Sequence, residues 1–324
     1  MIDPSLAYSV REKMTALAVD WRNAYLGFDA RGKPCAWPAF AADLAGVSPI
    51  LAEGEVLVES PLEALRDAPS HHAQVLSEAR MGEILLRIQT RGDWLLVASE
   101  DGYVAWLRSW SCRELLRAER DELILRRKGL VQPPLASLST AQGHPLALAG
   151  GTPLFELKDT SSDAHELSVE LVDGTRGKLR RESIRVVPLA AQISRLLPEA
   201  RQYLGTPYRW GGRSALGVDC SGYVQIVAHA CGYSLPRDAA QQARSGKAVS
   251  LRVDAWRPGD LVFFHEPVDH VAFYAGKGAI LHARGRVQEQ NFDQLDELMQ
   301  SVVAVRRLDD DDRLSHESLW SWIA

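Results

Sequence analysis

Short apolar runs separated by turn residues occur in two sets along the middle of the chain. From Val56 the first set includes residues 84–88, 94–98 and 103–107, with a turn at Asp101-Gly102. The second set follows a linker with Pro133 and Pro134 and includes residues 154–157, 167–172, 177–179 and 184–187. Runs of this length with such turns are typical of β-strands, so the pattern predicts two consecutive small β-barrels.

Helical patterns lie on either side of these strands. One covers residues 10–25 and precedes a loop rich in glycine and proline, and another covers 190–204. A third starts near residue 220 and is ended by Gly232 and Pro236. Strand-like runs then follow at 260–264 and 270–274, which makes the C-terminal third a mixed α+β domain. We therefore expect four parts: an N-terminal helical segment and loop (1–50), two β-barrel domains (51–124 and 125–188) and an α+β domain (189–324).

Composition narrows the possible partners. The 324 residues include 37 Lys and Arg against 42 Asp and Glu, a formal charge of -5, which argues against binding to nucleic acid or to anionic lipid. No apolar run approaches the roughly 18 residues that a membrane span needs. Asp3 and the lack of an apolar stretch in the first residues do not resemble a secretory signal, so we expect a cytoplasmic protein. The sequence gives no information on the oligomeric state.

The four cysteines are scattered, without the spacing of a disulfide framework or a zinc site. Cys220 follows a good N-cap residue, Asp219, and therefore falls in the first turn of the third predicted helix. The positive end of a helix dipole favours a thiolate, so this position predicts a lowered thiol pKa and a nucleophile. A small buried apolar residue is the alternative for Cys220, and it is the expectation for Cys35, Cys112 and Cys231.

Two histidines are placed to activate such a thiol. His270 opens a predicted strand, and His282 closes another. A cysteine at a helix start with two histidines at strand ends outlines a papain-like triad, in which His270 is the base and His282 orients it. His265 lies close to His270 but in a loop before Pro267, and we assign it no role.

Three short motifs occur in the order of a known family. They are Asp219-Cys220-Ser221-Gly222, Asp269-His270-Val271-Ala272 and Ile280-Leu281-His282-Ala283, with a Tyr208-Arg-Trp-Gly-Gly element upstream and Trp256-Arg-Pro-Gly-Asp260 in between. Together they cover about 130 residues. The C-terminal domain resembles the NlpC-type cell-wall cysteine peptidases, which implies a papain-like α+β fold.

The first barrel resembles bacterial SH3-like domains. The resemblance rests on Met81-Gly82-Glu83-Ile84, Gly92-Asp93-Trp94 and the segment from Asp101 to Trp106, about 60 residues in all. The second barrel lacks the Gly-Asp-Trp element, and its assignment as SH3-like rests on its position and strand pattern.

The resemblance assigns further roles. It implies that Tyr208 and the Cys220 amide stabilise the oxyanion, that Trp210 forms a pocket wall, and that Asp219 and Ser221 hold the D-glutamate of a murein peptide. Relatives with SH3-like domains cleave free peptides that begin with L-Ala-γ-D-Glu. They bind the free amino group with an acid at the position of Asp238 and close the pocket with a tyrosine that Tyr103 matches.

Three of these residues could have a purely structural role instead. Asp219 and Asp238 could each cap a helix, and Tyr103 could be a core aromatic of the barrel. Two positions also depart from the family. Gln74 stands where a second acid is expected, with Glu78 nearby, and Ala239 replaces a frequent serine.

The sequence therefore predicts a cysteine endopeptidase that cleaves the γ-D-glutamyl bond to diaminopimelate or lysine in murein tripeptides or tetrapeptides during cell-wall peptide recycling. No metal ion or cofactor is implied. Three alternatives stay open: a lysin or effector acting on intact peptidoglycan, a non-catalytic wall-binding protein, and an enzyme of acyl transfer or thioester hydrolysis.

Overall fold

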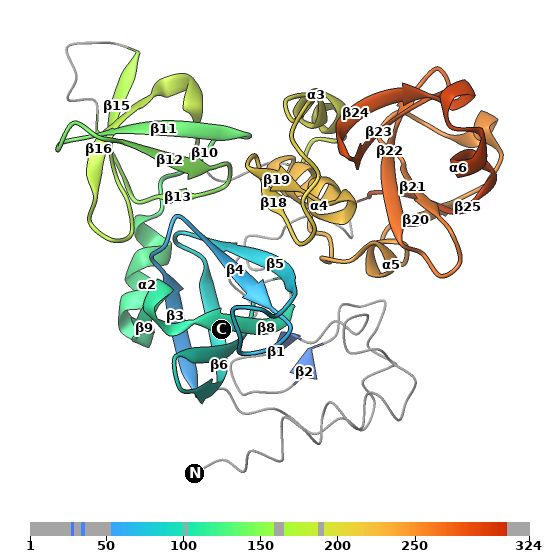
Figure 1. Cartoon of the computed structure of the whole chain (residues 1–324). Helices are drawn as coiled ribbons and strands as arrows, with labels where there is room; N and C mark the ends of the chain where they lie inside the picture. The colour runs from blue at the N-terminus through green and yellow to red at the C-terminus, as the bar shows by residue number, and fades with distance from the viewer. Residues whose placement is uncertain are drawn as a thin grey trace.

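The computed structural model describes residues 27–28, 34–35, 53–99, 101, 103–158, 165–186 and 191–309. The helix predicted at 10–25 and the tail beyond Asp309 lie outside these residues. Figure 1 shows three units: a first β-unit in blue and teal, a second β-unit in green, and a mixed unit in yellow to red. No helix among the described residues is long and apolar enough to cross a membrane.

The elements follow one another in three groups. A short N-terminal pair is formed by β1 (Gly27–Phe28) and β2 (Pro34–Cys35). The first β-unit contains β3 (Gly54–Val58), β4 (Leu62–Arg66), β5 (Val75–Arg80), β6 (Ile84–Arg91), β7 (Trp94–Ala98), β8 (Val104–Arg108), η2 (Ser109–Ser111) and β9 (Cys112–Leu115), and α2 (Arg117–Arg126) follows it. The second β-unit contains β10 (Gly129–Val131), β11 (Leu135–Thr140), β12 (Pro145–Ala149), β13 (Pro153–Leu154), β14 (Glu156–Lys158), β15 (Glu166–Glu170), β16 (Arg176–Arg180), η3 (Arg181–Ser183) and β17 (Ile184–Val186). The mixed unit contains η4 (Ile193–Arg195), α3 (Leu196–Arg201), β18 (Arg213–Ser214), β19 (Gly217–Val218), α4 (Cys220–Ala230), α5 (Ala239–Gln242), β20 (Lys247–Val249), η5 (Val253–Ala255), β21 (Leu261–Phe264), β22 (His270–Gly276), β23 (Ala279–Arg284), β24 (Arg286–Asn291), η6 (Phe292–Gln294), α6 (Asp296–Gln300) and β25 (Val302–Arg307).

Each β-unit surrounds its own apolar core. The first is a seven-stranded antiparallel sheet in the order β5-β4-β8-β7-β6-β3-β9, and its inward positions, such as Leu65, Val97 and Leu107, are fully buried. The second consists of a three-stranded sheet, β13-β10-β17, and a five-stranded sheet, β12-β11-β16-β15-β14, around residues such as Leu138 and Leu179. The two predicted sets of strands are confirmed, whereas α2 between them was not predicted.

The mixed unit has a six-stranded sheet between two layers. The strand order is β20-β25-β21-β22-β23-β24, and α4 packs on one face through Val224 and Val227 against Phe273 and Leu281. The opposite face is covered by α6 and an aromatic cluster around Trp256. Apolar residues on both faces of its central strands explain why their sequences read as continuous apolar runs.

Two local predictions differ from the structure. The helix expected at 190–204 is present but shorter, as η4 and α3 over 193–201, and its first turn is a 3₁₀ turn ahead of Pro198, which has no backbone N–H to donate to residue 194. His282 was expected at a strand end, but it is the fourth residue of the six-residue β23 and is fully buried. The strand continues because Ala283 and Arg284 pair with β24.

Candidate active site

Cys220 is the first residue of α4, as the sequence predicted. The Asp219 carboxylate accepts the Gly222 backbone N–H at 2.7 Å and so caps the helix. Gly222 is required here, because a Cβ atom at this position would lie 2.2 Å from the Gly212 carbonyl oxygen. The tightness of this turn fixes the backbone that presents the thiol.

A cavity of about 750 Å³ opens in front of this thiol. Its walls come from the first β-unit and from the mixed unit. They include every predicted site residue except the buried His282: Tyr103, Tyr208, Trp210, Asp219, Cys220, Ser221, Asp238 and His270. Residues that are far apart in the sequence are thus brought to one site.

Behind the cavity the two histidines form a relay. His270 Nε2 lies 3.0 Å from His282 Nδ1, and His282 Nε2 lies 2.8 Å from Gln290 Oε1. Burial and then the neighbouring His282 lower the pKa of His270 to about 3, and burial lowers the pKa of His282 as well. His270 is therefore neutral at pH 7, and Nδ1 of its ring remains to accept a proton.

The pKa of the Cys220 thiol is raised, whereas the sequence predicted that it is lowered. Burial and then the Asp219 carboxylate raise the pKa of Cys220 to about 12, although the backbone N–H groups of Val271 and Ser221 act in the other direction. The helix dipole is outweighed because the thiol is only 6 % exposed. At rest the thiol is protonated and donates to the Asp269 carbonyl oxygen at 3.7 Å. Attack on a carbonyl must therefore be accompanied by proton transfer to an imidazole.

Tyr208 and Trp210 lie on the same loop at the cavity. Tyr208 is half-buried, and burial together with the nearby Cys220 raises its pKa to about 12, so its hydroxyl keeps its proton and can donate. Its backbone N–H donates to the Gly285 carbonyl at 2.9 Å, which fixes the loop beside β23. Trp210 is 60 % exposed and stands at the rim of the cavity.

Asp219 makes more contacts within the protein than expected. Besides the helix cap, its carboxylate accepts the Gly211 N–H at 2.9 Å and pairs with Arg237 at 2.5 Å. Arg237 is 1 % exposed and also donates to Ser221 Oγ at 3.0 Å. The cap alternative for Asp219 is confirmed, and Arg237 is a site residue that the sequence analysis passed over.

Tyr103 and Asp238 meet across the boundary between the first β-unit and the mixed unit. Tyr103 belongs to the apolar core of the barrel, the structural role that the sequence left open for it, and its hydroxyl hydrogen-bonds to Asp238. Burial raises the pKa of Asp238 to about 7 against the opposing effect of Arg237. Asp238 also occupies the N-cap position of α5. Gln74 lines the same cavity, whereas Glu78 points elsewhere.

Glu78 joins the first β-unit to the loop that carries Tyr208 and Trp210. It is 4 % exposed, accepts the Arg213 N–H at 2.8 Å and forms an ion pair with Arg209. Gly211 packs so closely that a Cβ atom would lie 2.7 Å from the Val75 carbonyl oxygen. The first β-unit is therefore fixed directly to the site.

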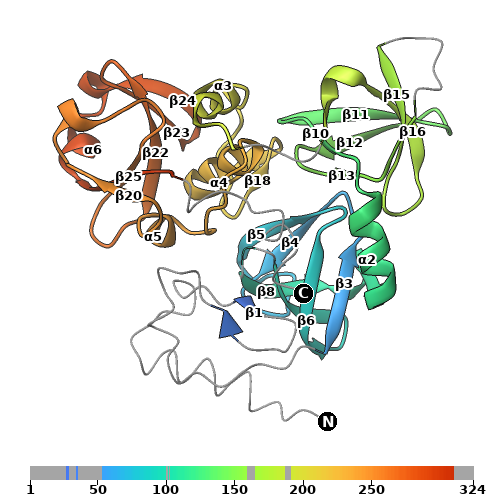
Figure 2. The same ribbon diagram turned by 180° about the vertical axis from the view of Figure 1, so that it is seen from behind.

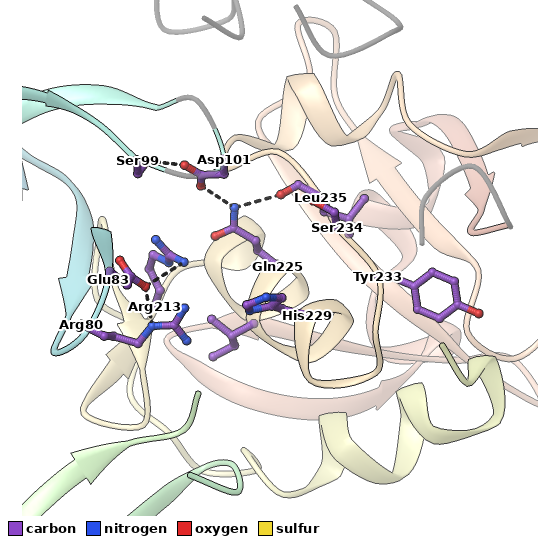
Figure 3. Close-up of a pocket in the computed structure, with 11 residues that line it drawn as sticks. Arg80, Glu83, Ser99, Asp101, Arg213, Gln225, His229, Tyr233, Ser234 and Leu235 are labelled. Atoms are coloured by element: carbon purple, nitrogen blue, oxygen red, sulfur yellow. Dashed lines mark hydrogen bonds and ion pairs between the residues drawn. The ribbon is translucent and has the colours of Figure 1, made fainter. Parts of the chain in front are cut away.

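A second, polar cavity of about 50 Å³ lies behind this junction (Figure 3). Arg80 and Arg213 converge there on Glu83, at 2.7 and 3.7 Å. On the other side, the Gln225 side chain of α4 donates to Asp101 at 2.8 Å. This network holds the turn before Tyr103 against the back of the helix that carries Cys220.

Gln290 was also missed by the sequence analysis. It lies on β24, diagonal to His282 on the neighbouring strand, and its side chain is polar and unremarkable in the sequence. The strand register, which the sequence does not specify, is what brings it to the second histidine. His265, to which no role was given, lines the cavity and bonds through Nδ1 to Asp269 at 2.5 Å.

Comparison with known proteins agrees with this geometry. The NlpC/P60 family model matches residues 205–307, the stretch that holds the thiol and both histidines. Residues 205–307 are an NlpC/P60 domain. A second model, the bacterial dipeptidyl-peptidase SH3 domain, matches residues 65–111 of the first β-unit. The chain is thus a cysteine peptidase with an SH3-like domain, and its papain-like fold is as predicted.

Several curated relatives cover more than the NlpC/P60 domain. A γ-D-glutamyl-L-lysine dipeptidyl-peptidase of Bacillus subtilis is 28% identical over 64% of this chain and 72% of its own length. One of the same name from Bacillus cereus is 29% identical over 64% of this chain and 66% of its own. Dipeptidyl-peptidase 6 of Lysinibacillus sphaericus is 32% identical over 47% of this chain and 57% of its own. The chain thus spans just under two thirds of the length of the Bacillus cereus relative and 57% of the length of the Lysinibacillus sphaericus relative.

A solved structure extends the likeness in fold to the β-units. The crystal structure of an NlpC/P60 family protein from Bacillus cereus has a TM-score of 0.68 and 23% identity, and the match covers 78% of this chain and 99% of that one.

Proposed function

We propose that the protein is an endopeptidase that hydrolyses the γ-D-glutamyl bond to an L-diamino acid in free murein peptides with an unblocked N-terminal L-Ala. The carrying observation is one cavity that holds the Cys220 thiol, the His270 imidazole and the pair formed by Tyr103 of the first β-unit and Asp238 of the mixed unit. The names of the Bacillus relatives support the bond.

The chemistry follows from the resting protonation states. Cys220 attacks the γ-carbonyl carbon while its proton passes to His270, which is neutral and held by His282. Tyr208 and the Cys220 N–H donate to the developing oxyanion. His270 then returns the proton to the leaving amine, and a thioester remains on Cys220. Water then attacks this thioester while His270 takes its proton, the C–S bond breaks, the Cys220 sulfur recovers the proton from His270, and the L-Ala-D-Glu product leaves with a free γ-carboxylate.

The substrate amine fits the end of the cavity under the first β-unit. An ammonium group finds a buried carboxylate in Asp238, which the Tyr103 hydroxyl holds in place. Gln74 supplies an amide where a second acid was expected, so Asp238 carries the charge complementarity alone among the residues at this end. A chain blocked at its N-terminus, as in polymeric murein, has no ammonium group to offer.

A cavity end that binds a free N-terminal ammonium group suits the free peptides released by wall turnover better than intact peptidoglycan. We therefore propose a role in peptide recycling, in the cytoplasm. Cell fractionation with an antibody against the chain tests the location, and recovery in the wall fraction would contradict it.

Product analysis by mass spectrometry tests the activity. Purified protein and Cys220→Ala are incubated with L-Ala-γ-D-Glu-diaminopimelate, its N-acetylated form and intact sacculi. We expect the free peptide alone to release its diamino acid, and only with the wild-type protein, because removal of the nucleophile removes the covalent path.

Each contrary outcome has a distinct meaning. Cleavage of sacculi or of the acetylated peptide would mean an open cleft and a lysin. Full activity of Cys220→Ala would refute the assignment of the nucleophile, and no cleavage of any substrate would favour a wall-binding protein.

A further inference from the structure

The catalytic cavity has charged walls besides those of the amine end. Its lining includes Gln74 of the first β-unit, Cys220 and His270, and also Arg284 and Glu297 of the peptidase domain. Glu297 lies on α6, which Figures 1 and 2 place on the side of the peptidase domain away from the first β-unit. If the L-Ala-γ-D-Glu part fills the amine end, the leaving amino acid occupies the part of the cavity lined by Arg284 and Glu297.

Two of these lining residues carry opposite charges without protein partners. Within the described residues, neither the Arg284 guanidinium nor the Glu297 carboxylate makes a hydrogen bond or an ion pair. A third charge, Asp269, is already bonded to His265 at 2.5 Å. Arg284 and Glu297 are therefore the groups free to bind a charged ligand there.

Resting on the proposed function, we propose that Arg284 and Glu297 form the subsite for the distal end of the leaving diamino acid and select diaminopimelate over lysine. Diaminopimelate ends in an ammonium group and a carboxylate on the same carbon. This pair of charges is complementary to a carboxylate and a guanidinium that line one cavity. Lysine ends in the ammonium group alone and leaves Arg284 without a partner.

The expected preference is moderate. A charge-assisted hydrogen bond between guanidinium and carboxylate contributes enough to change kcat/KM by about tenfold. Arg284 is exposed, which keeps the effect at this low end. The preference thus differs from the bond named for the Bacillus relatives, γ-D-glutamyl-L-lysine.

A ratio of two substrates separates selectivity from catalysis. Arg284 also contributes to the lowered pKa values of His270 and His282, so its removal alters the catalytic groups as well. Any such change acts on both substrates equally. It cancels in the ratio of kcat/KM values measured with one enzyme.

The test is a competition assay with three free peptides, L-Ala-γ-D-Glu-diaminopimelate, its analogue amidated at the distal carboxylate, and L-Ala-γ-D-Glu-L-Lys. For the wild-type protein we expect about tenfold preference for diaminopimelate over lysine and over the amide. Arg284→Gln should bring both ratios close to one. Glu297→Gln should lower kcat/KM for all three, because each retains the ammonium group.

Matched controls remove similar charges nearby. Arg286→Gln removes a guanidinium two residues further on, and Asp296→Asn removes the neighbouring carboxylate of α6; neither lines the cavity, and both should keep the wild-type ratios. Equal cleavage of diaminopimelate and lysine peptides by the wild-type protein, or an unchanged ratio in Arg284→Gln, would overturn the subsite. Cleavage of none of the peptides would instead overturn the proposed function, and the subsite with it.

Discussion

The two β-units are built alike but meet the peptidase domain in different ways. The first reaches the catalytic cavity with Tyr103 and Gln74 and pairs Glu78 with the loop that carries Tyr208. The second contacts the domain behind α4, where Arg185 pairs with Glu199 at 2.5 Å and donates to the Ala230 carbonyl oxygen. One unit thus shapes the site, and the other supports the helix that carries the nucleophile.

This difference shows that position, more than fold, assigns a role to a small β-unit. Both units bury polar contacts against the same domain, and their apolar cores touch each other, through Met81 in the core of the second unit and through Phe155 packed with Leu57 and Ile84 of the first. Mutations where the first β-unit contacts the peptidase domain should therefore change substrate turnover. Mutations where the second β-unit contacts it should change stability alone.

The largest effect is expected for Glu78→Gln in the first unit. The amide cannot pair with Arg209, and the loop with Tyr208 and Trp210 loses its fixed position. Misplacement of catalytic groups by about 1 Å costs about 100-fold in rate, so kcat/KM should fall by about 100-fold. Steady-state kinetics with the free tripeptide measure this. Glu166→Gln, which removes a partly exposed partner of Lys178, is the matched control and should behave as wild type.

Arg185→Gln tests the second unit. It leaves a nearly buried Glu199 with one cation fewer, which should lower the free energy of unfolding by about 3 kcal/mol. Urea denaturation followed by circular dichroism measures the change. At a temperature where the variant is folded, kcat/KM should equal the wild-type value. A clear loss of activity there would remove the distinction between the two units, and Lys178→Gln serves as a neutral surface control.

The smallest effect is a pH dependence from the amine end. The pKa of Asp238 is about 7, so its carboxylate is mostly protonated at pH 6 and half ionised at pH 7. Because only the ionised form attracts the substrate ammonium group, kcat/KM should rise about fivefold over this interval. His270, with a pKa of about 3, and Cys220, with a pKa of about 12, do not titrate there.

Asp238→Asn should lack this rise and have a higher KM. The same raised pKa means that Asp238 binds its proton more tightly in the folded wild-type protein than in the unfolded chain. The free energy of unfolding of the wild-type protein therefore falls as the pH rises from about 4 to 7. A wild-type profile that is flat between pH 6 and pH 7 would exclude Asp238 as the amine partner.

Much of the site was predictable because its signals are local. Asp219 and Cys220 are set by a helix cap, and His270 by the start of a strand whose apolar run is plain in the sequence. The strands of both β-units follow from turn residues and apolar runs in the same way. Gln290 and Arg237 gave no such signal, since each owes its role to a partner on another element.

The sequence by itself thus predicted Cys220 and the two histidines as the catalytic candidates and determined the type of each unit, because capping, strand patterns and motif order depend on neighbours in the chain. The protonation of the thiol was decided only by the tertiary structure, since burial and the Asp219 charge outweigh the helix dipole at Cys220. So was the meeting of Tyr103 with Asp238 and of Glu78 with Arg213. These contacts join residues more than 100 positions apart, and no local pattern specifies the packing of one unit against another.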